Sequence, residues 1–541
     1  MRLSLAIWRS LYVCSLIPIT FASGPQVNLR SGVFEGLVAG QGTEKFLGIP
    51  FAQPPVGSLR FKAPVPINQT FTGVRNATAF GNACVQPPSS SLGAPIGEDC
   101  LFLNVWRPEN TSTDASLPVL VWFYGGVFNT GAASSEEFDG TILVNRSIEI
   151  GKPMIFVSTN YRVNTFGFLA SASMAVEDLN NGLQDQSAAL RFVQENIAAF
   201  GGDPSKVTIW GQSAGAGSVE AHIVYNASAG LFRGAIMDSM TGPFKNSPAP
   251  STYDAPGKPF SLILNTTGCS AGPTAFACLQ ETPAEPLINF SNARVAATLN
   301  NQFWEPTVAP GSFSPVRASE IIAAGDFLHV PMIAGTNLNE GNSFSTSLLG
   351  LNLTGSAQDE AFDNFVRATV INQTLITSDV LDQFHTFYPA NDPSEGAPFN
   401  TGDSLFDRAA AWYGDFMFLS ARRRFLDVAA SLQPTFVYHF REFIPGNNVT
   451  LGVAHASELP LIFGPVPAVA AVEDDLAITW RDFYINFVND LNPGPAWPQF
   501  TNETKQVLQL KRDNITAIPD DFHSVMTDFD NSALVLNEWQ K

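Results

Sequence analysis

The chain has few charged side chains, and basic ones are the scarcer kind. Only 14% of its 541 residues are Asp, Glu, Lys or Arg, and 49 acidic residues against 29 basic ones give a net charge of −20. This balance argues against nucleic acids and anionic membrane surfaces as partners. Hydrophobic residues make up 45% of the chain, which is ample for a large folded core.

Cysteine and histidine are also scarce. None of the five cysteines and six histidines forms a cluster with the spacing of a zinc site, so we expect no metal and no organic cofactor. Apart from Cys14, close to the N-terminus, the cysteines are Cys84, Cys100, Cys269 and Cys278. Four cysteines allow three pairings, and we favour the local one, Cys84–Cys100 and Cys269–Cys278, because it closes two short loops.

Long apolar runs are nearly absent, and the one at the N-terminus has the features of a secretory signal. Arg2 and Arg9 are basic, residues 11–21 are largely apolar, and Thr20 and Ala22 are small residues of the kind found before a cleavage site. The run is too short to span a bilayer comfortably. We therefore predict a signal peptide over residues 1–22, a mature chain over 23–541 and no integral membrane segment.

Sites for N-linked glycosylation are dense, which fits export. A single Asn-x-Ser/Thr triplet carries little weight, but this sequence contains a dozen, at Asn68, Asn76, Asn110, Asn145, Asn226, Asn265, Asn289, Asn352, Asn372, Asn448, Asn502 and Asn514. With the signal peptide and the even number of remaining cysteines, they predict a secreted, extracellular glycoprotein.

The sequence lacks internal repeats, low-complexity tracts and any linker long enough to divide it, so we expect a single domain. Continuous apolar runs alternate with stretches of helical periodicity such as 183–199. The runs are Leu117–Phe123, 154–157, 234–237, 330–335 and Thr435–Phe440. Continuous runs are typical of strands buried on both faces of a parallel sheet, and their alternation with helices predicts an α/β fold.

The stretch that indicates chemistry follows a further short apolar run, 207–210. It reads Gly211-Gln212-Ser213-Ala214-Gly215 and leads into a helical segment. In a strand–turn–helix of this type the serine lies on a strained turn with its hydroxyl exposed, and the next backbone N–H points to where an oxyanion would form. The context predicts that Ser213 is a nucleophile.

A serine nucleophile needs a base, and on this type of fold the chain order is serine, acid, histidine. By elimination among six histidines we favour His455, in the loop 452–458 soon after a predicted strand. The acid is less well specified. The loop 337–341 follows the run that ends at Gly335 and carries Glu340. On position alone, Glu340 could equally be a solvated acidic residue of a loop without a catalytic role.

An oxyanion also needs preorganised donors. The glycine-rich stretch that follows residues 117–123 offers the N–H groups of Gly126 and Val127, and Ala214 offers a third. The alternative interpretation of this stretch is an ordinary tight turn.

Taken together, these stretches resemble the carboxylesterase/lipase family of α/β-hydrolases, which includes type-B carboxylesterases and fungal lipases. The resemblance rests on FGGDPSKVTIWGQSAG around Ser213, EDCLFLNVWRP from Glu98, FLGIPFAQPPVGSLRF from Phe46, NYRVNTFGFL from Asn160 and HASELPLIFG from His455. It implies an α/β-hydrolase fold, with a mostly parallel central sheet, helices on both faces and large insertions.

The resemblance also implies roles for individual residues. Ser213 would be the nucleophile, Glu340 the acid and His455 the base of a catalytic triad. Gly126, Val127 and Ala214 would form the oxyanion hole, and Cys84–Cys100 and Cys269–Cys278 would be disulfides.

Three positions and one loop depart from the family pattern, and one of these positions is Pro310, which stands where an aspartate is common. Val127 replaces the usual third glycine of the oxyanion loop, and Gln212 stands where a glutamate is common beside the nucleophile, which removes a negative charge. The loop between Cys84 and Cys100 is short, polar and free of aromatic residues. This loop disfavours a choline ester, which would need an aromatic face, and a large helical lid.

The sequence therefore predicts a secreted serine hydrolase that cleaves carboxylic esters of small molecules or lipids through an acyl-enzyme. A lipase or sterol esterase acting on long-chain esters and a feruloyl-type esterase are the alternatives among hydrolases. A non-catalytic adhesion or binding protein is a remote alternative, because such family members lose the nucleophile or the base and both are present here.

Overall fold

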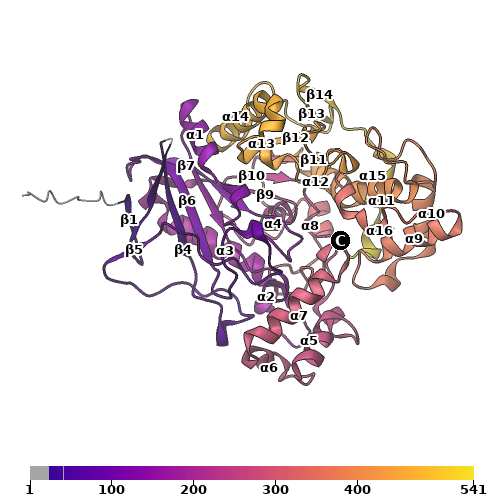
Figure 1. Ribbon diagram of the computed structural model, residues 1–541, viewed down its shortest axis with the longest axis horizontal. Helices are drawn as coiled ribbons and strands as arrows, with labels where there is room; N and C mark the ends of the chain where they lie inside the picture. The colour runs from indigo at the N-terminus through magenta and orange to yellow at the C-terminus, as the bar shows by residue number, and fades with distance from the viewer. Residues whose placement is uncertain (1–23, 41) are drawn as a thin grey trace, which may run out of the picture.

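The computed structural model describes residues 24–40 and 42–541, so the predicted signal peptide lies outside the described residues. Within these ranges a large mixed sheet runs through the molecule in the order β14-β13-β12-β11-β10-β9-β7-β8-β6-β4-β3, and a small sheet has the order β1-β2-β5 (Figure 1). The strands are β1 Gln26–Leu29, β2 Gly32–Glu35, β3 Leu37–Gly40, β4 Thr43–Pro50, β5 Val74–Asn76, β6 Phe102–Pro108, β7 Leu117–Phe123, β8 Ile155–Thr159, β9 Gly202–Gln212, β10 Gly234–Asp238, β11 Met332–Asn337, β12 Thr435–Phe440, β13 Gln506–Leu510 and β14 Thr516–Pro519.

The middle of the large sheet is parallel, from β8 through β7, β9, β10, β11 and β12 to β13, and its flanking strands are antiparallel. Strands β8, β10, β11 and β12 are buried along their whole length, which is why each reads as a continuous apolar run. The predicted α/β fold with a mostly parallel sheet is confirmed.

Helices cover both faces of this sheet. Helices α1, α13 and α14 pack together on one face, whereas α3, α4, α8 and α12 lie against the other (Figure 1). The helices are α1 Thr141–Glu149, α2 Asn164–Phe168, α3 Asn181–Asn196, α4 Ala214–Val224, α5 Pro259–Thr267, α6 Ala275–Glu281, α7 Ala284–Ala296, α8 Ala318–Ala324, α9 Ser356–Arg367, α10 Ser378–Phe387, α11 Ser404–Gly414, α12 Ser420–Ala429, α13 Leu459–Phe463, α14 Asp474–Asp490, α15 Ser524–Asp530 and α16 Ala533–Glu538.

The remaining helices form two groups beside the sheet. Helices α5, α6 and α7 build one hydrophobic cluster, and α9, α10, α11 and α16 build another. Figure 1 shows them as separate groups, pink below the sheet and orange to its right. A π-helical turn, Asp415–Leu419, joins α11 to α12. These groups are the large insertions that the sequence predicted.

The structure contains both disulfides in the pairing favoured from the sequence, Cys84–Cys100 and Cys269–Cys278. The first closes the short polar loop, and the second ties the middle of α6 to the turn after α5. Each therefore fixes a loop locally rather than joining distant parts of the chain.

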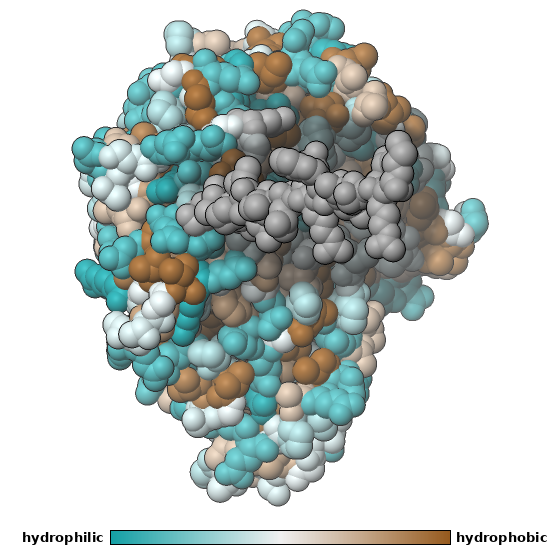
Figure 2. Space-filling view, turned by 60° about the vertical axis from the view of Figure 1, so that its left-hand side comes forward, coloured by the Kyte–Doolittle hydropathy of each residue, from teal (hydrophilic) through white to brown (hydrophobic). Residues whose placement is uncertain are grey.

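The surface mixes polar and apolar side chains. On the face in Figure 2, hydrophilic areas alternate with smaller hydrophobic ones. The exposed large hydrophobic residues belong to many different elements, among them Val38, Val176, Val449 and Val525. Over the part of the chain that the structure describes, no helix has both the length and the apolar character needed to cross a membrane.

A buried carboxylate connects α12 to the segment before α15. The side chain of Asp520 is 4% exposed, and its Oδ1 lies 2.6 Å from Arg422 Nη2 and 2.9 Å from Arg423 Nη2. Burial alone would raise the pKa of Asp520, but the two guanidinium groups outweigh it and lower this pKa to about 2.

The Asp520 carboxylate should therefore stabilise the fold only above the pH at which it protonates. Because its pKa is lower in the folded than in the unfolded chain, the contribution is complete above about pH 4 and is lost as the pH falls toward 2; it is worth about 2 kcal/mol. Urea unfolding of the wild type and Asp520→Asn should differ by at least this amount at pH 7 and converge at low pH. The exposed neighbour Asp521 provides the control, Asp521→Asn, and a difference independent of pH would contradict the assignment.

Candidate active site

Ser213 lies at the turn between β9 and α4. Its backbone has φ 58° and ψ −124°, a strained conformation for a residue with a side chain. The turn is so tight that a Cβ on Gly211 would lie 2.3 Å from the backbone of Gly215, and a Cβ on Gly215 would lie 2.0 Å from the carbonyl oxygen of Phe123. The two glycines are therefore required at this turn.

Glu340 lies in the loop after β11 and is hydrogen-bonded through both carboxylate oxygens. Its Oε1 accepts from Ser239 Oγ at 2.7 Å and from the backbone N–H of Asn337 at 2.6 Å, and its Oε2 lies 2.6 Å from His455 Nδ1. The side chains of His455 and Glu340 are only 9% and 3% exposed. A buried carboxylate held in this way orients the imidazole so that Nε2 is left as a proton acceptor.

Two asparagines lock the loops that carry Glu340 and His455 to each other. The backbone N–H of Asn339 donates to the carbonyl of Val453, and the N–H of Val453 donates to Asn339 Oδ1, both at 3.0 Å. Asn337 Nδ2 donates to the carbonyl of Ala454 at 2.8 Å. The contact between Glu340 and His455 is thus supported by three hydrogen bonds between the two loops, one of them between backbone groups.

Aromatic rings enclose the imidazole of His455. The centroid of its ring lies 5.1 Å from that of Phe344 and 4.7 Å from that of Phe418, which belongs to the π-helical turn. Phe344 also stacks on Tyr413 of α11 at 4.8 Å. The helical insertion around α11 and α12 therefore forms one wall of the site.

The side chain of Gln212 contacts Nε2 of His455, the ring nitrogen that Glu340 does not contact. Gln212 Nε2 lies 3.1 Å from His455 Nε2. Within the described part of the chain, Ser213 Oγ makes no hydrogen bond to His455. Gln212 therefore holds the position where Ser213, if it is the nucleophile, would have to donate its hydroxyl proton.

Two of the candidate oxyanion donors, Gly126 and Val127, lie on the loop after β7, and the third, Ala214, is the first residue of α4. Gly126, Val127 and Phe128 have φ values of 117°, 53° and 61°, and Val127 is a β-branched residue in a region that such residues rarely adopt. Its carbonyl accepts from Asn129 Nδ2 at 2.7 Å. Among the described residues, the N–H groups of Gly126, Val127 and Ala214 donate to no other protein group.

The other five histidines have different surroundings. His222 and His439 are buried, and burial lowers the pKa of each to about 3. His385 and His523 pair with aspartates, at 2.8 and 2.7 Å, and His329 lies 3.1 Å from a backbone carbonyl. Among the described residues, none of these five histidines forms a hydrogen bond with Glu340 or Gln212, whereas His455 forms one with each.

Several polar residues of the site escaped the sequence-based reasoning. Ser239, Asn337 and Asn339 hold the loops, and Asp238, at the end of β10, accepts from Trp210 Nε1 at 2.6 Å. Burial raises the pKa of Asp238 to about 6. The signal for all of them is position, since they follow the runs 234–237 and 330–335 at the same edge of the sheet as Ser213.

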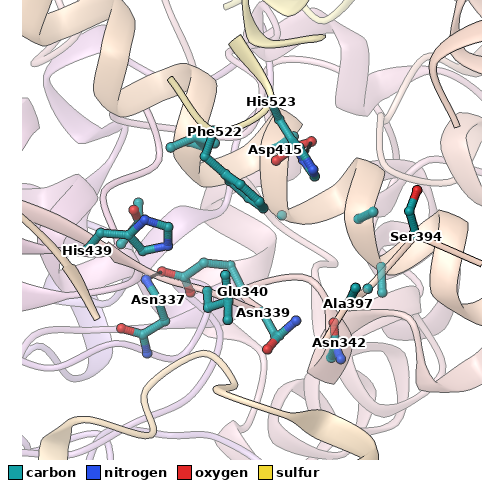
Figure 3. Close-up of a pocket in the computed structure, with 17 residues that line it drawn as sticks. Asn337, Asn339, Glu340, Asn342, Ser394, Ala397, Asp415, His439, Phe522 and His523 are labelled. Atoms are coloured by element: carbon teal, nitrogen blue, oxygen red, sulfur yellow. Dashed lines mark hydrogen bonds and ion pairs between the residues drawn. The ribbon is translucent and has the colours of Figure 1, made fainter. Parts of the chain in front are cut away.

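A cavity of about 170 Å³ lies next to Glu340, which forms part of its lining (Figure 3). In this view Asn337, Asn339 and Glu340 lie along one side, and the pair Asp415 and His523 lies on the other. Ser213 and His455 do not line this cavity. It is therefore distinct from the space at the nucleophile.

Comparisons with known proteins agree with this geometry. A family model described as the carboxylesterase family matches residues 23–524. The chain is 34% identical to "Secreted lipase 1" of Botryotinia fuckeliana (strain B05.10), over 94% of this chain and 93% of the relative. It is 33% identical to "Lipase 2" of Diutina rugosa, over 91% of this chain and 93% of the relative.

A solved structure is also similar. The crystal structure of Aspergillus niger EstA superimposes with a TM-score of 0.82 at 27% identity and covers 96% of this chain and 99% of its own. The family resemblance predicted from the sequence and the single-domain fold are confirmed. The chain belongs to the carboxylesterase family and is a carboxylic ester hydrolase.

Proposed function

We propose that this hydrolase cleaves carboxylic esters through a triad of Ser213, His455 and Glu340 and a covalent acyl-enzyme. The observation that carries the proposal is the buried 2.6 Å contact between Glu340 Oε2 and His455 Nδ1, next to a serine on a strained strand-to-helix turn. A neutral imidazole held through Nδ1 presents Nε2 as a base, which an alcohol nucleophile requires.

In the first half of the reaction, Ser213 Oγ bonds to the ester carbonyl carbon while His455 Nε2 takes its proton. The negative charge that develops on the carbonyl oxygen is stabilised by the N–H groups of Gly126, Val127 and Ala214. The carbon–oxygen bond to the alcohol then breaks, and the His455 imidazolium protonates the leaving oxygen.

In the second half, a water molecule replaces the alcohol. His455 removes its proton, the hydroxyl adds to the acyl carbon, and the bond to Ser213 Oγ breaks as that oxygen regains a proton from His455. The products are a carboxylic acid, an alcohol and the free enzyme, so no cofactor enters the balance. Glu340 stays ionised and stabilises the imidazolium in both halves.

Gln212 has a defined part in this proposal. Its amide donates to His455 Nε2 at rest and has to release this nitrogen before Ser213 can donate there. Because the amide is neutral, it keeps the imidazole oriented without adding a negative charge that would favour the protonated ring.

The first prediction concerns the nucleophile. Ser213→Ala removes the atom that forms the acyl-enzyme, so kcat for p-nitrophenyl acetate should fall by at least about 10³-fold. The matched control is Ser205→Ala, at the exposed beginning of the same strand β9, which should keep wild-type activity. Equal activity of Ser213→Ala and the wild type would refute the assignment.

The second prediction concerns Gln212. In Gln212→Glu a carboxylate replaces the amide next to His455 Nε2 and stabilises the imidazolium, so the loss of kcat/KM on the acid side should move to higher pH by about one unit or more. The reason is that only the neutral imidazole accepts the proton of Ser213. The measurement is the pH profile of kcat/KM for p-nitrophenyl acetate, and superimposable profiles would show that Gln212 does not act on His455.

We also propose that the protein is secreted, after removal of residues 1–22. Ten of the twelve glycosylation triplets have an exposed asparagine, whereas Asn145 and Asn372 are only partly exposed. In addition, two relatives carry "secreted" in their names, those of Botryotinia fuckeliana and Gibberella zeae.

Expression with its own N-terminus in a fungal or yeast host should therefore place the protein in the medium, beginning at Ser23. N-terminal sequencing and mass spectrometry before and after deglycosylation provide the measurement. A protein retained in the cell with Met1 in place would contradict secretion.

A further inference from the structure

The space beside Ser213 is small, and an ion pair forms part of its lining. A cavity of about 30 Å³ opens at Ser213, with room for about two water molecules. It is lined by Val127, Phe128, Ser213, Ala214, Thr241, Lys245, Gln302, Glu305, Phe344, Tyr413, Met417 and Phe418. Half of these side chains are apolar, and three of the polar ones, Lys245, Gln302 and Glu305, come together through direct contacts.

Lys245 and Glu305 form a buried ion pair. Lys245 Nζ lies 3.0 Å from Glu305 Oε1, and the two side chains are 5% and 3% exposed. Lys245 Nζ also donates to Gln302 Oε1, and Gln302 Nε2 donates to the hydroxyl of Tyr413 at 3.2 Å. Since each group satisfies the next, displacing any of them would leave a charge or a polar group buried without a partner.

The backbone around this pair is held in place. The hydroxyl of Tyr253 donates to the carbonyl of Glu305 at 3.1 Å and accepts from its N–H at 3.0 Å. Asn129 Nδ2, on the oxyanion loop, donates to the carbonyl of Trp304 at 3.1 Å. On the other side, Phe244 packs edge-on against Phe128 with centroids 5.7 Å apart. The ion pair is thus anchored to the same loop that carries two of the proposed oxyanion donors.

From the roles proposed for Ser213 and His455, we assign this cavity to the acyl side of the ester; Phe344 and Phe418, which pack on the His455 ring, also belong to its lining. His455, which has to protonate the leaving alcohol, is absent from its lining, whereas the donors Val127 and Ala214 and the nucleophile are present. With the carbonyl oxygen at those donors, the group that extends away from His455 is the acyl group.

We propose that the Lys245–Glu305 pair ends the acyl pocket and restricts this enzyme to esters of short, uncharged carboxylic acids, of about two to four carbons. The inference rests on the proposed function, because it assigns the acyl side from the roles of Ser213 and His455. Burial of an alkyl chain normally raises kcat/KM by about fourfold for every methylene. In this enzyme a longer acyl chain would contact a desolvated ion pair instead, so kcat/KM does not gain from the added methylenes. A charged acyl group gains nothing either, because the opposite charges of the pair give it no net attraction.

The wild type provides the first test. Its kcat/KM for p-nitrophenyl acetate, butanoate, hexanoate and octanoate should be highest at acetate or butanoate and at least about tenfold lower at octanoate. Octanoate hydrolysed as well as butanoate would overturn the inference while leaving the proposed function intact. No hydrolysis of any of these esters would overturn the proposed function and the inference with it.

The second test removes both charges together. In Lys245→Met/Glu305→Leu no buried charge loses its partner, and such replacements are often neutral or stabilising. The ratio of kcat/KM for octanoate to that for acetate should rise by at least about tenfold over the wild type. An unchanged ratio in a variant whose midpoint of thermal unfolding equals that of the wild type would overturn the assignment. If the variant does not fold, the chain-length profile of the wild type alone decides whether the inference holds.

A control variant separates this effect from a general loss of ion pairs. Lys152 and Asp490 form a pair at 2.6 Å that is 34% and 54% exposed, near the end of α14 and outside the residues that line the cavity. Lys152→Met/Asp490→Leu should keep the wild-type chain-length profile. A shift toward octanoate in this control as large as in the first double variant would also overturn the inference.

Discussion

The hydrogen bond between Glu340 and His455 is the interaction on which the arrangement of the site depends. A carboxylate with 3% of its side chain exposed is costly to bury unless its oxygens accept hydrogen bonds. Ser239 and the backbone of Asn337 meet this requirement on one oxygen, and His455 meets it on the other. The hydrogen bonds that offset the cost of burying the Glu340 carboxylate therefore also orient the imidazole of His455. One set of contacts stabilises the carboxylate and positions the ring.

Much of this could be predicted from the sequence, because some features are local. Strands β7 and β12 match their predicted bounds since a strand buried in a parallel sheet reads as an apolar run bounded by turn residues. Strand β9 begins at Gly202 rather than at residue 207, because its pairing with β7 extends it through a stretch whose glycine and proline suggested a loop. Ser213 and His455 could be proposed as catalytic residues from the turn and the loop that carry them.

The rest could not be predicted, because it joins segments that are far apart in the sequence. The contact of Gln212 with His455 and that of Ser239 with Glu340 each link residues more than 100 positions apart. The pair of Lys245 and Glu305 forms between two loops with no regular pattern of their own. A chain with only 14% charged residues places several of them in its interior, and composition does not say which.

The parallel register of the sheet bears on how correct folding of the purified protein can be judged. Ser213, Glu340 and His455 follow β9, β11 and β12, whose alignment is fixed by pairs such as Asp238 with Gln212 and Asn337 with Phe440. A slip of one residue between neighbouring strands moves a loop by about 3.3 Å, which is more than the length of a hydrogen bond. Under the proposed mechanism, turnover by purified material therefore reports the fraction of molecules with correctly aligned strands, which measures of helix content or compactness do not distinguish.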